Sequence, residues 1–271
     1  DPVWPHERKK YVSEDCCARF CLGSESDQRN TAGLINNISA FFKDETSEVP
    51  NVKLHTNDPA YCIYTSGTSG KPKGVLVSHE GVWSLRKYFL TSQEIKKRPI
   101  SLQFASFAFD ASISELCMGI LSGNTMVMVP DEIKYDARKL EQFLNDQKVD
   151  IGIIPPQYLD LMKQTGLKTV ISAGSETNPE IVKQHSQNAV YSNDYGPTEA
   201  TVCATYWKYD GKGKIPYRIP IGKPIYNKKI YIMENNTLCG IQIPGEICIA
   251  GDGIALGYLN RPKLTDERFV Q

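Results

Sequence analysis

The sequence has no excess of charge of either sign. Its 271 residues include 31 Lys and Arg and 31 Asp and Glu, so the formal net charge is zero. A chain with this balance offers no strongly basic surface for nucleic acid or for an anionic membrane. It also lacks a recognisable signal peptide and an apolar run long enough to cross a bilayer. We therefore expect a cytoplasmic globular protein with neither nucleic-acid nor membrane partners.

Metal-binding cysteine motifs are missing as well. The eight cysteines include no CxxC pair, and no histidine stands at metal-ligand spacing from any of them. A chain of this length and apolar content does not depend on a disulfide framework. Free thiols, most of them buried, are therefore the expected state of the cysteines.

From Asp58 onward the chain shows a regular alternation of strand and helix signals. Short apolar runs rich in β-branched residues alternate with segments of helical period. The expected strands are 60–64, 74–77, 102–107, 125–129, 151–154, 169–172 and 190–193, and the expected helices are 31–42, 80–90, 112–121, 136–147 and 178–187. This alternation is typical of an α/β architecture built around mostly parallel sheet.

The pattern changes after about residue 217. Strands are expected at 230–233 and 246–250, separated by turns rich in Gly, Asn and Pro, with no helix between them. We therefore predict an α/β region over residues 1–217, followed by a small β-rich, barrel-like subdomain over residues 218–271.

Residues 64–74 read YTSGTSGKPKG and lie between two strand-like runs. Glycines let successive backbone N–H groups converge, hydroxyls add donors, and Lys73 can place a positive charge on phosphate oxygens. A Walker loop is excluded, because Thr65 stands where its first glycine is required and Pro72 follows Lys71. A flexible surface loop is the alternative that the adjoining strand disfavours. The candidate phosphate-binding residues are Thr65, Ser66, Gly67, Thr68, Ser69, Gly70 and Lys73.

Residues 64–74 resemble the phosphate loop of the acyl-adenylate-forming enzymes, which include acyl-CoA synthetases, luciferases and the adenylation domains of nonribosomal peptide synthetases. The segment FASFAFDAS at 104–112 is similar to the substrate-side motif of the peptide-synthetase branch. That resemblance implies that Asp110 pairs with the α-ammonium of an amino acid, since an ammonium taken out of water needs a carboxylate partner. The alternative for Asp110 is the N-cap of the following helix.

Residues 193–204, NDYGPTEATVCA, resemble the adenine and metal motif of the same family. The resemblance implies that Tyr195 stacks on adenine and that Asn193 or its backbone reads the base edge. It also implies that Thr198 meets the α-phosphate and that Glu199 coordinates Mg²⁺, which prefers carboxylate oxygen. The further residues of the nucleotide cleft would be Gly174, Ser175 and Gly196.

The reaction implied by this resemblance is attack of a carboxylate oxygen on the α-phosphorus of ATP, with release of pyrophosphate. Lys73, Thr198 and Glu199 would carry it by aligning the reactants and neutralising charge. The acyl group would then pass to the phosphopantetheine of a peptidyl carrier protein domain beside other synthetase domains. Since complete members carry further N- and C-terminal parts, we expect the chain to be a fragment with little activity alone. The alternatives are another acyl- or aryl-CoA or D-alanine-carrier ligase, and an inactive nucleotide-binding module.

The resemblance also implies a pocket for the amino-acid side chain. Its residues would be Asp110, Ala111, Ser114, Ile153, Ile171, Ala173, Asp194, Val202 and Cys203. The small residues Ala111, Ser114 and Ala173 leave room, which favours a large aromatic amino acid such as Tyr or Trp. Asp194 departs from aromatic-type pockets, and a buried carboxylate needs a partner. That partner could be a phenol, indole or cationic group of the substrate, or a neighbouring loop that Asp194 caps.

Overall fold

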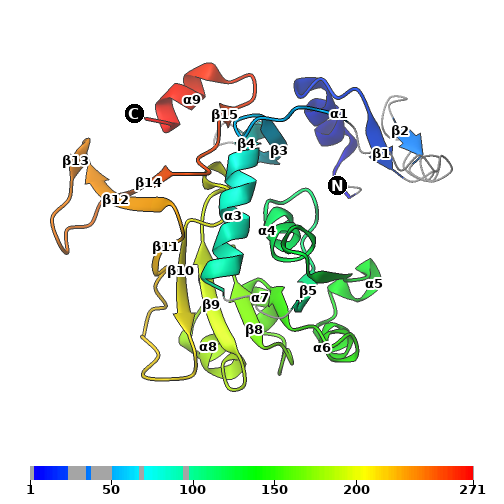
Figure 1. Cartoon of the computed structure of the whole chain (residues 1–271), viewed down its shortest axis with the longest axis vertical. Helices are drawn as coiled ribbons and strands as arrows, with labels where there is room; N and C mark the ends of the chain where they lie inside the picture. The colour runs from blue at the N-terminus through cyan, green and yellow to red at the C-terminus, as the bar shows by residue number, and fades with distance from the viewer. Residues whose placement is uncertain (1–2, 24–34, 38–50, 67–69, 94–97, 271) are drawn as a thin grey trace.

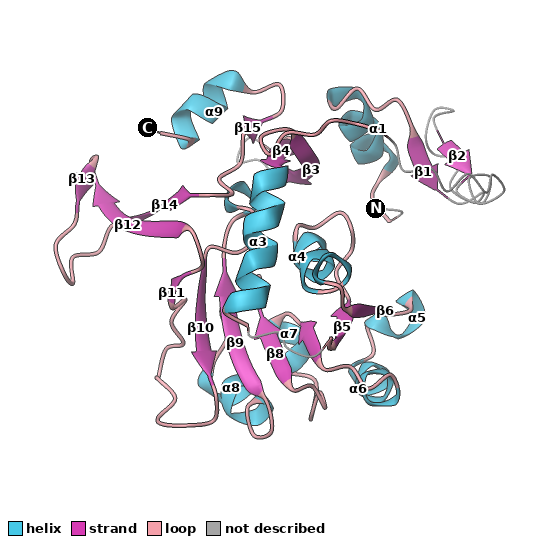
Figure 2. Cartoon of the chain, viewed as in Figure 1, coloured by secondary structure: helices cyan, strands magenta, loops and turns pink. Residues whose placement is uncertain are grey.

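The computed structural model describes residues 3–23, 35–37, 51–66, 70–93 and 98–270. Within them, a seven-stranded sheet of order β11-β10-β9-β8-β7-β5-β6 forms the centre of the molecule (Figures 1 and 2). The strands are β5 (Ile100–Gln103), β6 (Thr125–Met128), β7 (Ile151–Ile153), β8 (Thr169–Ser172), β9 (Val190–Tyr195), β10 (Thr205–Tyr209) and β11 (Lys223–Pro224). Pairs from β6 to β9 are parallel, whereas β10 and β11 join antiparallel. The predicted α/β fold with a mostly parallel sheet is confirmed.

Helices cover both faces of this sheet. The elements outside the strands are α1 (His6–Asp15), α3 (His79–Thr91), α4 (Ala111–Met118), η2 (Ile120–Ser122), α5 (Asp131–Lys134), α6 (Ala137–Asp146), α7 (Pro156–Leu159), α8 (Pro179–His185), η3 (Thr198–Ala200) and α9 (Pro262–Arg268). Successive strand residues point to opposite faces. Val170 of β8 therefore packs in the core under α6, α7 and α8, while the next residue, Ile171, packs under α3 and α4.

The first two predicted strands lie outside the central sheet. β3 (Pro59–Thr65) and β4 (Lys73–Ser78) pair antiparallel, and β15 (Gly257–Tyr258) joins β4 to complete a three-stranded sheet. Their assignment to the α/β alternation was wrong. The segment between β3 and β4 is too short for the crossover that parallel strands require, so the chain turns back on itself instead.

Two predicted boundaries and one predicted helix also need correction. The strand expected at 102–107 ends at Gln103, because Glu115 captures the next two backbone N–H groups. The helix expected at 112–121 ends at Met118 and is followed by η2. Within the helix expected at 31–42, residues 35–37 instead form β2 (Ile35–Asn37), which pairs with β1 (Cys21–Gly23). Strand pairing overrides local propensity there, and the remainder of 31–42 lies outside the described residues.

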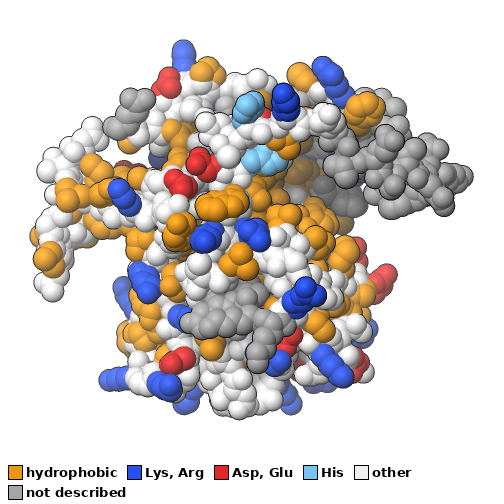
Figure 3. All heavy atoms as spheres, in the orientation of Figure 1, with side chains coloured by type: hydrophobic (Ala, Val, Ile, Leu, Met, Phe, Trp, Pro, Cys, Tyr) orange, Lys and Arg blue, Asp and Glu red, His pale blue; other side chains and the backbone are white. Residues whose placement is uncertain are grey.

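The last part of the chain contains a further three-stranded sheet that projects from the body (Figure 1). Its antiparallel strands are β12 (Lys228–Glu234), β13 (Thr237–Leu238) and β14 (Glu246–Gly251). Hydrophobic side chains gather on this projection and across the middle of the molecular face in Figure 3, over α3. The exposed hydrophobic residues include Ile241, between β13 and β14, and Trp83 on α3. Among the described helices, none has the length and apolarity to span a bilayer.

Candidate functional site

The predicted site residues meet where the parallel strands of the central sheet end. Ile153 closes β7, Ala173 follows β8, and Tyr195 closes β9. In open α/β sheets ligands bind outside the carboxyl ends of the strands. The residues that face this edge come from the β3–β4 hairpin, α4, η3 and β15, so the site is assembled from two sheets and two helical segments.

Lys73, Glu199 and Tyr258 form a closed triangle of hydrogen bonds at this edge. Lys73 Nζ lies 2.7 Å from Glu199 Oε1 and 2.8 Å from the Tyr258 hydroxyl, which in turn donates to Glu199 Oε1 across 2.6 Å. Burial opposes the charge on Lys73, but these bonds outweigh it and raise the pKa of the ammonium. Burial likewise opposes the carboxylate, yet the same bonds lower the pKa of Glu199. Both groups are therefore charged at neutral pH.

Asp110 and Thr198 form a second contact between distant segments. Thr198 Oγ1 donates to Asp110 Oδ2 across 2.5 Å. Asp110 stands directly before α4, but its side chain makes no cap hydrogen bond to that helix. The helix-capping alternative is therefore not the arrangement seen. Burial raises the pKa of Asp110, and the bond from Thr198 opposes that shift. A mostly buried carboxylate is thus held beside the turn that carries Glu199.

The hairpin between β3 and β4 presents part of the predicted phosphate loop. Thr65 ends β3 with its hydroxyl oxygen buried and without a hydrogen-bond partner among the described residues, which is uncommon for a buried polar atom. Ser66 is exposed. Gly70 has a φ of +82° with open space around it, a conformation that side-chain-bearing residues rarely adopt. Gly67, Thr68 and Ser69 lie outside the described residues.

The predicted nucleotide residues lie after β8 and along β9. Gly174 has a φ of +89° and open space beside it, and Ser175 donates to Gln157. Tyr195 is partly exposed at the end of β9. Asn193 donates its amide to the carbonyl of Pro220, so that end of its side chain is already occupied. Gly196 completes this set. A Cβ at this position would lie 2.4 Å from the carbonyl oxygen of Val202, so there is no room for a side chain.

The predicted side-chain pocket forms one cluster between the sheet and helices α3 and α4. Its apolar members share the core on that face: Ile153, Ile171, Ala173, Val202 and Cys203. Ser114 is buried on α4 and Ala111 is half-buried at its start. These apolar residues therefore pack in one cluster under α3 and α4, and their role as a substrate pocket stays a prediction.

Asp194 is held by partners from within the protein. Its carboxylate accepts from Tyr88 across 2.7 Å, from Ser192 across 2.6 Å and from the Cys203 thiol. Gln93 donates to the Tyr88 hydroxyl and to Ser192, which extends the network. Burial raises the pKa of Asp194 to about 6, against the lowering effect of these bonds. The loop-capping role considered for Asp194 is not the one seen.

Sequence reasoning missed Glu115, Tyr88 and Tyr258. Glu115 is fully buried and accepts the backbone N–H groups of Phe104 and Ala105, so it fixes the segment that leads to Asp110. The available signal was a lone carboxylate among apolar residues of α4, which rarely stays buried without partners. Tyr258 offered no comparable signal, because the partners of its hydroxyl are distant in sequence.

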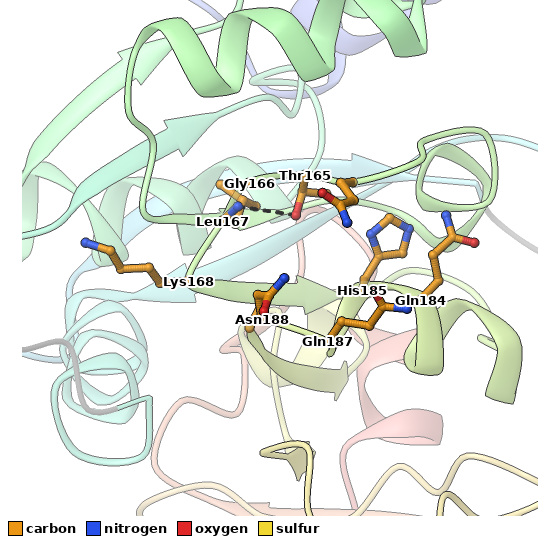
Figure 4. A pocket seen from close by; sticks show the side chains of 10 residues that line it. Thr165, Gly166, Leu167, Lys168, Gln184, His185, Gln187 and Asn188 are labelled. Carbon is orange, nitrogen blue, oxygen red and sulfur yellow. Dashed lines mark hydrogen bonds between the residues drawn. The ribbon is translucent and has the colours of Figure 1, made fainter.

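A small pocket of about 120 Å³ lies at the opposite edge of the sheet (Figure 4). Its lining includes Lys168, directly before β8, and Ala189, directly before β9. His185 contacts it, with Nε2 held 2.8 Å from the Leu159 carbonyl and its pKa lowered by burial. None of the predicted site residues lines this pocket.

The described residues contain no cluster of three or more His, Cys, Asp or Glu that could hold a metal ion. Mg²⁺ in nucleotide enzymes commonly uses one or two carboxylates, with phosphates and water completing its shell. The single carboxylate of Glu199, next to a phosphate-type loop, therefore fits a cation that arrives with a nucleotide. It does not fit a resident metal bound by protein groups alone.

The geometry and the sequence place the chain in a known class. Residues 1–259 match the family of AMP-binding enzymes, and the chain belongs to that family. It is 37% identical to gramicidin S synthase 1 of Brevibacillus brevis and 34% identical to tyrocidine synthase 1 of Brevibacillus parabrevis. These matches cover the whole chain but only 25% and 26% of the relatives, so the chain spans about a quarter of their length. The resemblance to peptide-synthetase adenylation domains is confirmed.

Solved structures share the fold. The N-terminal subdomain of NpsA from Klebsiella oxytoca, in complex with 3-hydroxybenzoyl-AMSN, superposes with a TM-score of 0.85 at 24% identity, over 99% of this chain and 71% of that one. The nonribosomal peptide synthetase FmoA3 gives a TM-score of 0.86 at 24% identity, over 99% of this chain and 30% of that one. At this identity the likeness establishes the fold alone.

Proposed function

We propose that this chain binds ATP and an amino acid side by side and joins them as an aminoacyl-adenylate for nonribosomal peptide synthesis. The observation that carries the proposal is the hydrogen bond between Thr198 and Asp110. It joins the turn that carries Glu199 to the carboxylate suited to an α-ammonium. The sequence resemblance assigns nucleotide binding and amino-acid binding to separate motifs, and this hydrogen bond joins the two motifs.

Each residue has a role that its surroundings support. Asp110 holds the ammonium, which orients the substrate carboxylate toward the α-phosphorus. Lys73 and Thr65 hold phosphate oxygens, and Thr198 turns from Asp110 to the α-phosphate when the substrates enter. Glu199 holds Mg²⁺, which would neutralise charge on the phosphates. The aminoacyl group then passes to the phosphopantetheine thiol of a peptidyl carrier protein domain within a larger synthetase.

The proposed substrate is a large aromatic amino acid. In the proposed pocket, small residues would line the α4 side and the end of β8, and the buried side chains of Ile153 and Ile171 would form apolar walls. The Asp194–Tyr88 network adds a polar group next to these walls. An aromatic ring with a polar edge, as in Tyr or Trp, matches this combination because its donor must be satisfied when buried.

Calorimetric titration of the chain with a panel of non-hydrolysable aminoacyl-sulfamoyl adenosines tests the proposal. We expect the tyrosyl or tryptophanyl analogue to bind at least about tenfold more tightly than the alanyl or valyl analogue, as pocket size dictates. Tighter binding of the small aliphatic analogues would remove the aromatic assignment. Binding of AMP without any preference among aminoacyl groups would favour an inactive nucleotide-binding module.

The variant Asp110→Asn tests whether the bound substrate carries an α-amino group. It keeps the shape of the side chain but removes its charge, so we expect roughly a tenfold or greater loss of affinity for aminoacyl analogues. The matched analogue without the α-amino group should bind wild type and variant equally. Wild-type protein that prefers this des-amino analogue would point to an acyl- or aryl-CoA ligase instead.

A further inference from the structure

Tyr258 is held rigidly beside the candidate site. It is 6% exposed and packs in a small core with Val75 and Val77 of β4. Its ring meets Phe269 edge-on at 5.4 Å, and its backbone N–H donates to Thr265 Oγ1. Because β15 pairs with β4, the Tyr258 ring has a fixed position relative to the strand that begins at Lys73.

The Tyr258 hydroxyl uses both of its hydrogen-bonding capacities on charged groups. It donates to Glu199 Oε1 and accepts from Lys73 Nζ, and the same ammonium lies 4.1 Å from the centre of the Tyr258 ring. A phenol is well suited to this position, because one hydroxyl can donate to a carboxylate and accept from an ammonium together.

Residues 253–258 also form hydrogen bonds with the η3 turn and the residue that follows it. Ala255 N–H donates to the Glu199 carbonyl across 2.8 Å, and Thr201 Oγ1 donates to the Gly253 carbonyl. Glu199 is therefore fixed at its main chain and at one carboxylate oxygen by residues 253–258. Among the described residues, both side-chain bonds to Glu199 end on Oε1 and none on Oε2.

We propose that Tyr258 is a positioning residue for the nucleotide site, which orients the Glu199 carboxylate toward Mg²⁺ while leaving Lys73 free to turn to the phosphates. The inference rests on the proposed function, since it assigns Glu199 to the metal and Lys73 to phosphate. When Lys73 leaves the triangle, the bond from Tyr258 keeps Oε1 in place and Oε2 open. Without that bond the Glu199 side chain can rotate away, and the site loses its affinity for the metal-bound nucleotide.

The variant Tyr258→Phe tests this by removing one oxygen while keeping the ring in its core. The readout is calorimetric binding of ATP across a Mg²⁺ titration, with AMP in the absence of Mg²⁺ as the metal-independent reference. Removing a group that supports a metal ligand commonly weakens metal affinity 10- to 100-fold. We expect a shift of about tenfold or more in the Mg²⁺ concentration needed for ATP binding, with AMP affinity unchanged. The matched control is Tyr231→Phe, a partly exposed tyrosine on the projecting β12.

A double variant shows whether Tyr258 acts through Glu199. In the Glu199→Gln background, Tyr258→Phe should add no further loss, because non-additivity is expected for residues in one network. Full additivity would overturn the inference, and so would an unchanged Mg²⁺ requirement in Tyr258→Phe. Equal loss of AMP and Mg·ATP binding would reduce Tyr258 to a purely structural residue. Failure of the wild-type chain to bind any nucleotide would overturn the proposed function itself, and this inference with it.

Discussion

Thr198 Oγ1 lies 2.5 Å from Asp110 Oδ2, although 88 residues separate the two in sequence. This bond ties η3 to the start of α4, and therefore ties the proposed phosphate side of the site to its amino-acid side. Asp110 is partly protected from water by burial, which raises its pKa, and Thr198 is the hydrogen-bonding side chain that limits the rise. Binding of nucleotide on one side should therefore change the affinity for the amino acid on the other, and the reverse should also hold.

Replacing Thr198 by Val should disturb Asp110 without touching its side chain. Loss of the donated hydrogen bond removes a stabilisation of the carboxylate, so we expect the pKa of Asp110 to rise further. NMR titration of the Asp110 carboxyl carbon measures the shift. Thr205→Val is the matched control, because the Thr205 hydroxyl is buried without a partner among the described residues. An unchanged Asp110 pKa in Thr198→Val would contradict the role given to this bond.

Replacing Glu115 by Gln should change how stability depends on pH. Burial raises the pKa of Glu115 to about 7, against the bonds from Ala105 and Phe104. Since the folded state keeps the proton longer than the unfolded state, the contribution of Glu115 to stability is largest below pH 4.5 and is lost by pH 7. The stability of wild type relative to Glu115→Gln should therefore fall from pH 5 to pH 7, by about 2 kcal/mol.

Urea denaturation at several pH values measures this difference in the free energy of unfolding. The control is Glu132→Gln, an exposed carboxylate on α5, which should follow wild type throughout. A constant difference between wild type and Glu115→Gln across this range would mean that Glu115 titrates as in the unfolded chain.

Lys228 should make the stability of the protein rise with pH in the alkaline range, which is opposite to the effect of Glu115. Its ammonium is buried and donates to the backbone carbonyls of Ala200 and Gly253, and burial lowers its pKa to about 8. Between pH 8 and pH 10.5 the unfolded chain binds a proton that the folded chain does not, so this residue makes stability rise with pH. In Lys228→Met that rise should disappear, by up to about 3 kcal/mol over the full interval.

Urea denaturation of wild type and Lys228→Met from pH 7.5 to 9.5 isolates the effect, since other titrating groups are common to both. The neighbouring Lys229→Met is the matched control, because Lys229 is exposed on the same strand. Parallel stability curves for wild type and Lys228→Met would show that the ammonium keeps its ordinary pKa when folded.

Local patterns predicted the elements whose residues are close in sequence. The helix expected at 178–187 is present as α8, and the Asn178 side chain caps it by accepting from Ile181 N–H. The glycines and hydroxyls of the phosphate loop likewise stand between two strands, as expected. In each case the residues that contact one another to form the element are close in sequence, so a short stretch of sequence is enough to predict it.

What the sequence could not predict depends on partners far away. β15 is two residues long and exists because it pairs with β4, so no periodicity could reveal it. Asp194 was recognised as a buried carboxylate in need of partners, but Tyr88 supplies one of them from 106 residues earlier. Side-chain networks of this kind require the fold before their members can be named.

The triangle at the site also has a consequence for how the protein folds. Lys73 and Tyr258 meet across 185 residues of chain, and Lys73 and Glu199 across 126. Contacts between such distant positions form slowly, because the entropy of closing the intervening chain is lost before the contact stabilises anything. Nucleotide should therefore bind only late in refolding, once β15 has docked on β4. A ligand present from the start would act by trapping the finished structure, and it would slow unfolding far more than it would speed folding.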